Sequence, residues 1–165
     1  MADQNFTLTQ EYLQSIFDYK DGHLYWKKSK QKTPKGKKLG SIHHSGYIYT
    51  HLNKKHLAVH RLIFLYHHGY LPNFIDHINR NKSDNRIENL RPATKQQNSF
   101  NVSASKANKS GFKGVHWHIR DKKWQVYLSV DGKNKHFGCY FDIEVAKFVA
   151  ETMRYKYHKN FANNG

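Results

Sequence analysis

Residues 76–94 read DHINRNKSDNRIENLRPAT, and this stretch decides how the chain around it folds. Apolar runs at residues 74–78 and 90–91 predict two short strands, and the polar residues 79–88 predict a loop between them. Thr94-Lys95-Gln96-Gln97 has the form of a capping box, so a helix should follow at once, with Asn98 in its first turn. The predicted order is therefore strand, loop, strand, helix.

Side chains on the inner edges of this motif suit the hydrolysis of a phosphodiester bond, which needs a base for water and neutralisation of the developing charge. His77 is a base that titrates near neutral pH. Asp76 and Asn98 offer the hard oxygen atoms that a Mg²⁺-like ion prefers. Neighbours in a regular strand face opposite sides, so a bend or bulge must let Asp76 and His77 serve one centre.

The asparagines of the loop are expected to hold its shape. Asn89 can accept a hydrogen bond from the Nδ1–H of His77, or it can hold the loop. Short polar side chains of this kind commonly bond backbone groups in turns. We expect that backbone role for the others: Asn79, Asn81 and Asn85.

The charge of the chain indicates a polyanionic partner. Lys and Arg number 28 against 12 Asp and Glu, which gives a formal net charge of +16. Residues 1–104 carry +9 (16 basic, 7 acidic) and residues 105–165 carry +7 (12 basic, 5 acidic), so both parts should attract nucleic acid. A basic protein with no such partner is the plainer alternative.

The remaining composition bounds the class of protein. The 11 Tyr, 10 Phe and 3 Trp argue for a folded core. A single cysteine, Cys139, excludes disulfides within the chain and clustered-Cys zinc sites. The sequence has no apolar run of about 18 residues and no charged-then-apolar leader, so we expect no membrane partner and an intracellular, cytoplasmic location.

Elements before the motif are predicted from local signals. A helix should begin at residues 7–10, with Leu13, Ile16 and Phe17 on one face, and a strand at residues 23–26 should follow the Asp21-Gly22 turn. Residues 27–38 hold seven lysines and no acid, which predicts a basic loop, either a solvated connector or a phosphate-contacting arm. A hairpin should follow, which pairs residues 46–52 with residues 56–59. A helix should then begin at His60 and end at Gly69.

The last third of the chain has its own plan. Residues 103–110 are small and polar and predict a linker. Three strands should follow, at residues 111–119, 123–130 and 135–141. Asp142 is a good N-cap for an amphipathic helix that covers them. We therefore expect an α+β protein with two domains.

The motif resembles the HNH endonucleases of phages and mobile introns over about residues 7–104. The resemblance implies a ββα-metal fold that nicks or cuts duplex DNA with one divalent ion, Mg²⁺ or Mn²⁺, and leaves 5′-phosphate and 3′-hydroxyl ends. It places the nuclease in residues 1–104 and the linker in 105–109. The matching residues are His60-Arg61-Leu62, residues 75–79, Asn81-Lys82, residues 85–91 and Asn98.

Roles carried over from this resemblance fall on the same side chains. His77 would be the general base, with Asn89 positioning it, and Asp76 and Asn98 would be the metal ligands. Asn98 stands where the name-giving motif has a second His, which favours a hard-oxygen metal site. Contacts to DNA are expected from the remaining basic residues of the motif: His60, Arg61 and Arg91. A capping or core role for His60 is the alternative.

Residues 110–165 resemble the APETALA-type DNA-binding domain of plant ethylene-response factors, through Ser110-Gly111-Phe112-Lys113-Gly114-Val115 and the later aromatic positions. The resemblance implies a sheet that enters the major groove of DNA. Histidines stand where the plant pattern has arginines, so the site preference should differ. Residues 138–141 are one residue longer than the pattern. The reading face would carry Lys113, His116, His118, Arg120, Trp124 and Lys135. For Trp117 and Trp124 the alternative is packing under the helix, and we expect it for at least one of them.

The first hypothesis is therefore a homing-type, metal-dependent endonuclease for double-stranded DNA, with its chemistry in the first domain and its site choice in the second, acting in a phage-infected bacterial host. A non-enzymatic DNA-binding protein with an inactive nuclease domain is the alternative, and an RNA-binding protein is a third. Cutting both strands with one active site requires either a homodimer or sequential nicks, and both stay open.

Overall fold

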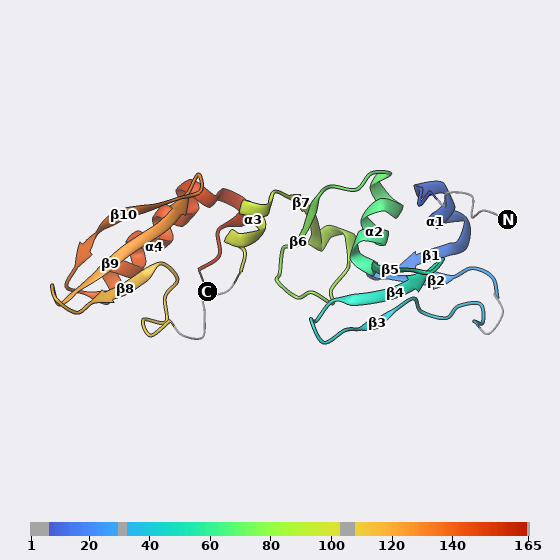
Figure 1. Cartoon of the computed structure of the whole chain (residues 1–165), viewed down its shortest axis with the longest axis horizontal. Helices are drawn as coiled ribbons and strands as arrows, with labels where there is room; N and C mark the ends of the chain where they lie inside the picture. Colours follow the sequence, from blue (N-terminus) through green and yellow to red (C-terminus); the bar gives the residue numbers. More distant parts are fainter. Residues whose placement is uncertain (1–6, 30–32, 103–107, 165) are drawn as a thin grey trace. The chain divides into compact units, whose positions relative to one another are not determined.

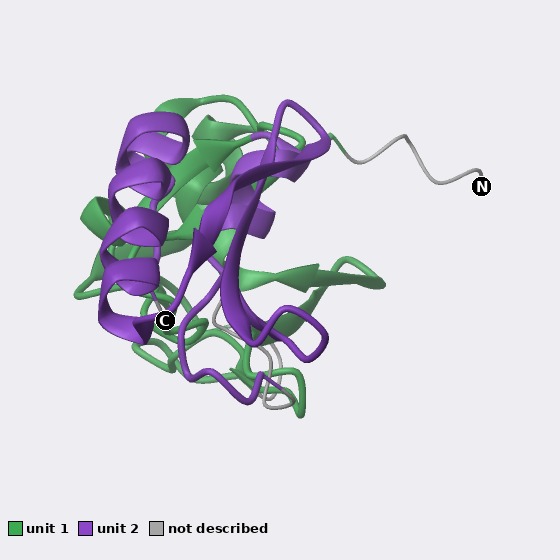
Figure 2. Ribbon diagram, turned by 90° about the vertical axis from the view of Figure 1, so that its left-hand side faces the viewer, with its two compact units in different colours: residues 1–93 green, residues 94–165 purple. Residues whose placement is uncertain are grey.

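The computed structural model describes residues 7–29, 33–102 and 108–164 of the chain. The chain forms two compact units, residues 1–93 and residues 94–165, which we call the first unit and the second unit (Figure 2). They divide between Ala93 and Thr94, earlier than the predicted end of the nuclease domain at residue 104. Residues 105–107 of the predicted linker lie outside the described ranges.

The first unit combines helices with small antiparallel sheets, in which β1 pairs with β2, β4 pairs with β3 and β5, and β6 pairs with β7 (Figure 1). Its described elements in chain order are α1 (Gln10–Ile16), β1 (Phe17–Lys20), β2 (His23–Trp26), β3 (Ser41–Ile42), β4 (Ile48–Leu52), β5 (Lys55–Ala58), α2 (Val59–His68), β6 (Phe74–His77), the 3₁₀ helix η1 (Ile87–Asn89) and β7 (Leu90–Ala93).

Local signals explain where these elements begin and end. The Thr9 side chain accepts a hydrogen bond from the Tyr12 N–H and starts α1. Asn53 and Lys54, both with positive φ, make the tight turn between β4 and β5. Gly69 ends α2 in the left-handed conformation, with φ 72°, which glycine adopts without a steric penalty.

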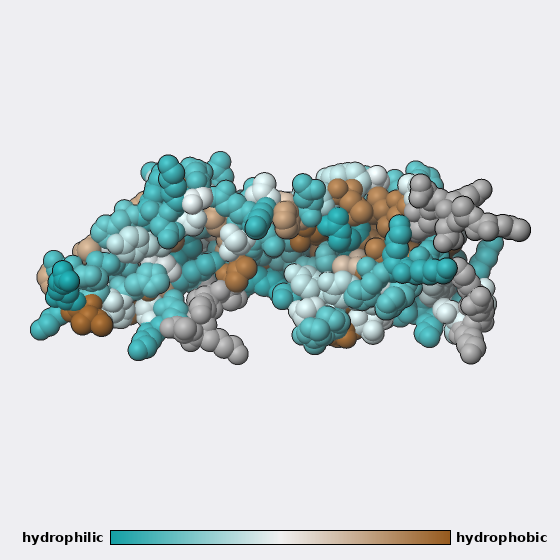
Figure 3. All heavy atoms as spheres, in the orientation of Figure 1, coloured by the Kyte–Doolittle hydropathy of each residue, from teal (hydrophilic) through white to brown (hydrophobic). Residues whose placement is uncertain are grey.

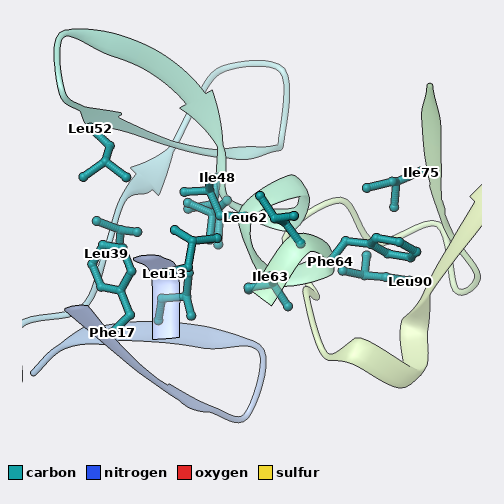
Figure 4. Packing of buried hydrophobic residues seen from close by; sticks show 13 residues of the cluster. Leu13, Phe17, Leu39, Ile48, Leu52, Leu62, Ile63, Phe64, Ile75 and Leu90 are labelled. Carbon is teal, nitrogen blue, oxygen red and sulfur yellow. The ribbon is translucent and has the colours of Figure 1, made fainter. Parts of the chain in front are cut away.

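Helix α2 forms the centre of the first core. Val59, Leu62, Ile63 and Phe64 on this helix are almost fully buried. Figure 4 shows Phe64 beside Ile75 and Leu90 of the β6–β7 hairpin, while residues of α1, β1 and β4 surround the rest of the cluster. The helix therefore packs the hairpin against the remainder of the first unit. Truncating a core aromatic such as Phe64 to alanine should lower the free energy of unfolding by about 3–5 kcal/mol.

The second unit is a three-stranded sheet covered by one long helix (Figure 2). Ala146 and Ala150 of the helix pack with Val115 and Val126 of the sheet. Small residues on the helix let it approach the strands closely. Its described elements are α3 (Lys95–Phe100), β8 (Val115–His118), β9 (Lys123–Val130), β10 (Lys133–Tyr140), α4 (Ile143–His158) and the 3₁₀ helix η2 (Lys159–Phe161).

A β-bulge interrupts the pairing of β10 with β9 near position 138. His136 pairs with Tyr127, whereas Cys139 pairs with Gln125, so β10 has one more residue than β9 across this step. Gly138 occupies the bulge with φ 120°. Such a φ strains any residue with a Cβ, which explains the glycine.

Strands differ from the sequence prediction at several places, and two of them have a clear physical reason. Phe17 was expected on the first helix, but α1 ends at Ile16 and Phe17 begins β1, paired with Trp26. Its side chain is buried in either element, so the apolar pattern did not separate the two. The first strand of the second unit is shorter than predicted and begins at Val115, because Gly114 with φ 78° still belongs to the preceding turn.

Candidate active site

The β6–β7 hairpin carries the first two predicted site residues at the end of a strand. It pairs in continuous antiparallel register, with Asp76 opposite Arg91. His77 is the last residue of β6, and the chain turns directly after it, because the Arg80 N–H bonds the His77 carbonyl oxygen at 2.9 Å. Of the bend or bulge expected between Asp76 and His77, the bulge is not found in this described hairpin, since the register leaves no room for an extra residue.

The His77 imidazole lies in a buried aromatic cluster. Its exposed fraction is 4%, and its Nε2 lies 2.9 Å from Oδ1 of Asn85. The ring of His60 on α2 is 5.2 Å away between centroids, and the ring of Tyr47 is 5.8 Å away. Three separate segments therefore fix the orientation of one imidazole.

The contact with Asn85 couples the tautomer of the ring to the orientation of the amide. When the amide oxygen faces the imidazole, as it does here, it can only accept, and the ring that satisfies it has its proton on Nε2 and its basic nitrogen at Nδ1. Asn85 is 1% exposed, and its Nδ2 has no hydrogen-bond partner among the described residues. Asn85 was expected to serve loop backbone, and the structure corrects this: burial directs its oxygen to the imidazole.

Asn89 holds the loop, which is the second of the two roles expected for it. Its Oδ1 accepts from the Asn79 N–H at 2.9 Å, and its Nδ2 donates to Asn79 Oδ1 and to the Asp84 carbonyl oxygen. Asp84 is held in turn by a two-pronged contact from Arg86, at 2.9 and 2.7 Å. These bonds fix the shape of the loop before any ligand binds.

Asp76 forms a buried ion pair with Arg91. The guanidinium Nε and NH2 lie 2.8 and 2.7 Å from Oδ2 of the carboxylate, which is 5% exposed. Arg91 was predicted to contact DNA, but in this structure its guanidinium is directed at the neighbouring strand's carboxylate. A cation that binds Asp76 therefore competes with Arg91 or shares the carboxylate with it.

Burial keeps the histidines of this cluster neutral. Desolvation lowers the pKa of His77 from 6.5, and its hydrogen bond to Asn85 and the nearby Asp76 and Asp84 carboxylates partly offset this. Burial, with the nearby His77 and Arg61, lowers the pKa of His60 to about 3. The His77 imidazole is thus in its proton-accepting form at pH 7.

Asn98 lies on α3 in the second unit and is half-buried. The predicted capping box is confirmed, since Thr94 Oγ1 accepts from the Gln97 N–H and the Gln97 side chain accepts from the Thr94 N–H. The Asn98 N–H bonds the Thr94 carbonyl oxygen at 3.0 Å, which places Asn98 in the first turn, as predicted.

Of the two further predicted DNA contacts in the first unit, one is buried. His60 has an exposed fraction of 8% and packs against Tyr47 and His77, so the core alternative applies to it. Arg61 is partly exposed and donates to the Asn73 carbonyl oxygen at 3.3 Å.

The outer face of the second unit's sheet, opposite α4, carries some of the predicted DNA-binding residues. His116 pairs with Gln125 and His118 with Lys123 on that face, and Arg120 is exposed in the following turn. Nδ1 of His118 also lies 3.0 Å from a carboxylate oxygen of Asp121.

Three other predictions for that face are corrected. Trp124 packs against the buried cluster on the helix side, because it shares the face of Val126. Lys135 is on the same side, with its ammonium 5.5 Å from the ring of Tyr157 on α4. The Lys113 ammonium donates to the carbonyl oxygens of Phe100, the last residue of α3, and of Val102.

The donors present suit a hard cation better than a transition metal. Among the described residues, no group of three or more His, Cys, Asp or Glu side chains could hold a metal ion. A Mg²⁺-like ion keeps several waters and needs only one or two protein oxygens. A carboxylate such as Asp76 and an amide oxygen such as that of Asn98 therefore fit such an ion chemically.

Comparison with known proteins agrees with the motif. Residues 57–100 match the family described as HNH endonuclease. Protein 3.8 of Escherichia phage T7 is 34% identical over 89 residues, which cover 54% of this chain and 73% of that protein. An HNH endonuclease of Acanthamoeba polyphaga mimivirus is 45% identical over 62 residues, which cover 36% of this chain and 33% of that protein. No solved structure matches.

The candidate site lies within the residues that match the family. The matched residues run from β5 through α2 and the β6–β7 hairpin to α3, and they include His77, Asn85 and Asn98. None of the helices in the described part is long and apolar enough to cross a membrane. The chain belongs to the HNH endonuclease family, with its HNH domain at residues 57–100.

Proposed function

We propose that the chain is a metal-dependent endonuclease that hydrolyses phosphodiester bonds in duplex DNA. The observation that carries this proposal is the buried His77 imidazole, oriented by Asn85 within the HNH domain. Burial lowers its pKa, so the ring is neutral at pH 7. In the proposed reaction, Nδ1 of His77 takes the proton of the attacking water, while Nε2–H stays bonded to Asn85.

Asp76 and Asn98 are the proposed ligands of one divalent ion, Mg²⁺ or Mn²⁺. When bound, such an ion supplies positive charge that stabilises the phosphate and the leaving oxygen. Asp76 must then release or share its contact with Arg91. Arg91, once released, is a cation beside the site that can contact a phosphate oxygen, which agrees with its predicted role in DNA binding.

Asn89 is proposed to position His77 indirectly. Its three side-chain hydrogen bonds hold the loop to Asn79 and Asp84, and Asn85 belongs to the same loop. A rigid loop keeps Asn85 beside the imidazole, so that no ordering is needed when DNA binds. Asn89 therefore acts on the chemistry through the loop.

Duplex DNA is the proposed partner, and the second unit is its proposed reader. The net charge of +16 supports a polyanionic partner, and the face seen in Figure 3 is mostly hydrophilic. The outer face of the sheet presents His116, His118 and Arg120 beside the exposed ring of Tyr127. We propose in addition that the second unit is a DNA-binding domain of the APETALA type and that the endonuclease is of the homing type.

Metal-dependent cleavage tests the proposal directly. The purified chain is incubated with supercoiled plasmid and Mg²⁺ or Mn²⁺, with chelator as the control. We expect nicked or linear products whose ends carry 5′-phosphate and 3′-hydroxyl groups. The ratio of nicked to linear product against protein concentration separates sequential nicks from the action of a homodimer. Intact plasmid with either ion would reject the enzyme.

One observation favours a second candidate, a non-enzymatic DNA-binding protein. The buried Asp76–Arg91 pair occupies a proposed metal ligand and could persist when DNA binds. Such a protein would shift duplex DNA in a gel and leave it uncut at every metal concentration. Competition by RNA for the same duplex probe tests the RNA-binding alternative.

A further inference from the structure

Helix α4 has two different faces within the second unit. The face toward the sheet is buried through Ala146 and Ala150, and Figure 2 shows the helix lying against the strands. The opposite face is exposed and carries large apolar side chains. Phe148 is 69% exposed and Tyr155 is 63% exposed, and Val145, which precedes them, is 47% exposed. The solvent face of an amphipathic helix is normally polar, so this face has the character of an interaction surface.

The exposed residues of α4 have the spacing of a seam between two helices. Val145, Phe148, Thr152 and Tyr155 alternate in steps of three and four positions, which is the pattern of side chains that meet a partner helix. The Thr152 hydroxyl already donates to the Phe148 carbonyl oxygen at 2.8 Å, so this residue offers its methyl group to a partner. We call these four residues the α4 seam.

The two edges of the α4 seam carry opposite charges. Glu144 and Glu151 lie along one edge, and Lys156 lies along the other. Glu144 is paired with Lys147 of its own helix, at 3.6 Å. Within the described part of the chain, neither Glu151 nor Lys156 forms an ion pair. Both charges are therefore available to a partner.

These charges suit a second copy of the chain whose helix runs parallel to the first. In a parallel pair, a residue on one edge faces the residue five positions later on the partner's opposite edge, so Glu151 faces Lys156 of the second copy. Two-fold symmetry makes this contact twice. In an antiparallel pair the acidic edges would meet, and the like charges of Glu144 and Glu151 would repel each other.

The small size of the α4 seam makes the pair weak. The seam holds two aromatic side chains, which can bury about 150–250 Å² each, whereas a stable complex buries about 800 Å² on each partner. Each copy also carries a net charge of +16, which opposes association. DNA neutralises this charge and holds bound copies at a high local concentration. The pair should therefore form at high protein concentration, and more readily on DNA.

We infer that the α4 seam is a homodimer interface, in which two copies of the chain pair through parallel α4 helices. Cleavage of both strands was left open between sequential nicks and a homodimer, and this inference gives the homodimer a surface. Its meaning for cleavage rests on the proposed endonuclease, because the pair would bring two nuclease domains to one DNA.

Sedimentation equilibrium of the full chain tests the seam. The protein is followed up to about 1 mM, where even a weak pair is populated, in about 1 M salt, which screens the net charge. Phe148→Glu places a charge in the seam, and Ile42→Glu, at a 71% exposed apolar position on β3, is the matched control. We expect dimers for the wild type and for Ile42→Glu, and monomers for Phe148→Glu. Thermal melting checks that each variant folds.

Two results of this experiment would overturn the inference. A wild type that stays monomeric at every concentration would show that no second copy occupies the seam, which would then belong to a different partner. A dimer that survives Phe148→Glu would show that another surface holds the two copies together.

Charge reversal tests the direction of the paired helices. Neutral substitutions are too mild, since an exposed ion pair contributes only about 0–1 kcal/mol. Thr152→Cys, combined with Cys139→Ser to remove the native thiol, allows a disulfide between two copies at the middle of the seam. One such chain carries Glu151→Lys, and a second chain, distinguished by a tag, carries Lys156→Glu. The two are mixed in a thiol–disulfide buffer until the disulfides reach equilibrium.

We expect more of the mixed disulfide than random pairing gives, because only the mixed pair joins opposite charges at both contacts. In the control mixture, Glu11→Lys and Lys54→Glu replace the reversals on α4, at exposed positions of the first unit. These control chains should pair at random. A random distribution for the variants on α4 would overturn the parallel pairing.

Failure of the proposed function looks different. A chain that pairs through the α4 seam and leaves DNA intact with Mg²⁺ and with Mn²⁺ would reject the endonuclease and keep the homodimer interface. A chain that stays monomeric and cuts DNA would reject the interface and keep the endonuclease.

Discussion

The side chain of Asn85 bonds the catalytic candidate His77, with Oδ1 2.9 Å from Nε2 and both residues buried. Asn89, the middle letter of the motif, bonds instead to Asn79 and Asp84 within the loop. Asn85 therefore orients the base, and Asn89, four positions later, holds the loop. The position of the proton on Nδ1 or Nε2 depends on the first of them.

Replacing Asn85 should lower the rate of cleavage more than the binding of DNA. We expect Asn85→Ala to reduce kcat about 10- to 100-fold with little change in KM, because the imidazole loses its orienting contact. Asn85→Asp keeps an acceptor oxygen and should retain more activity. Asn81→Ala, in an exposed part of the same loop, is the control. Equal losses for the variants at positions 81 and 85 would contradict the assignment.

His77→Ala should abolish most cleavage and leave DNA binding intact. A general base contributes about 10²–10⁴-fold to a rate. Plasmid nicking measures the chemistry, and a gel shift with the same DNA measures the binding. His51→Ala, an exposed histidine on β4, serves as the control. Cleavage by His77→Ala at the wild-type rate would remove His77 from the mechanism.

Breaking the ion pair at the hairpin should make stability depend on metal. Arg91→Met leaves the buried Asp76 carboxylate without its cation, at a cost of about 3–5 kcal/mol. Added Mg²⁺ should recover part of the lost free energy of unfolding, because the ion replaces the guanidinium charge. Urea unfolding with and without Mg²⁺ measures this.

The control for that experiment is Arg86→Met, which removes an exposed guanidinium from Asp84. We expect Mg²⁺ to leave its unfolding curve unchanged. If Mg²⁺ stabilised neither variant, Asp76 would not be a metal ligand.

Acid should destabilise the first unit below pH 6.5. The unfolded chain protonates His60 near pH 6.5, whereas burial lowers the pKa of the folded residue to about 3. The unfolded state therefore binds more protons in this window, and stability is full above pH 6.5 and is lost as the pH falls toward 3. The slope is at most about 1.4 kcal/mol per pH unit for one histidine.

Urea unfolding on both sides of pH 6.5 measures the slope. His60→Phe should flatten it, since the replacement takes up no proton in either state. His51→Phe, at an exposed position, should keep the wild-type slope. Identical slopes for the variant at position 60 and the wild type would show that another group causes the acid sensitivity.

Arg120→Gln should weaken DNA binding without changing the chemistry at saturating DNA. Arg120 is exposed in the turn after β8. The loss of one phosphate contact should reduce the slope of log affinity against log salt by about 1. Lys156→Gln, exposed on α4, is the control, and equal effects of both variants would mean that charge alone matters.

Much of the fold could be predicted from local patterns. The strand at residues 23–26, the end of α2 at Gly69, the capping box at Thr94 and the start of α4 after Asp142 all follow from short-range chemistry. What escaped prediction depends on distant partners. Phe17 is apolar in a helix or in a strand, and only its pairing with Trp26 decides between them.

The site was predictable in its residue types but not in its contacts. The loop asparagines are chemically alike, and no local signal separates Asn85 from its neighbours. Its burial beside the His77 imidazole makes the difference. Similarly, Lys113 reads as one more surface cation, and only the folded second unit brings its ammonium to the end of α3.

The break in packing at Thr94 has a consequence for exchange of modules between such proteins. A chimaera joined after residue 100, where the family match ends, would separate Phe100 of α3 from the His158 ring on which it stacks, and α3 from Lys113 at its end. A joint between Ala93 and Thr94 would carry the helix and its support together. Recombination that preserves the packing of α3 should therefore favour crossovers before the helix.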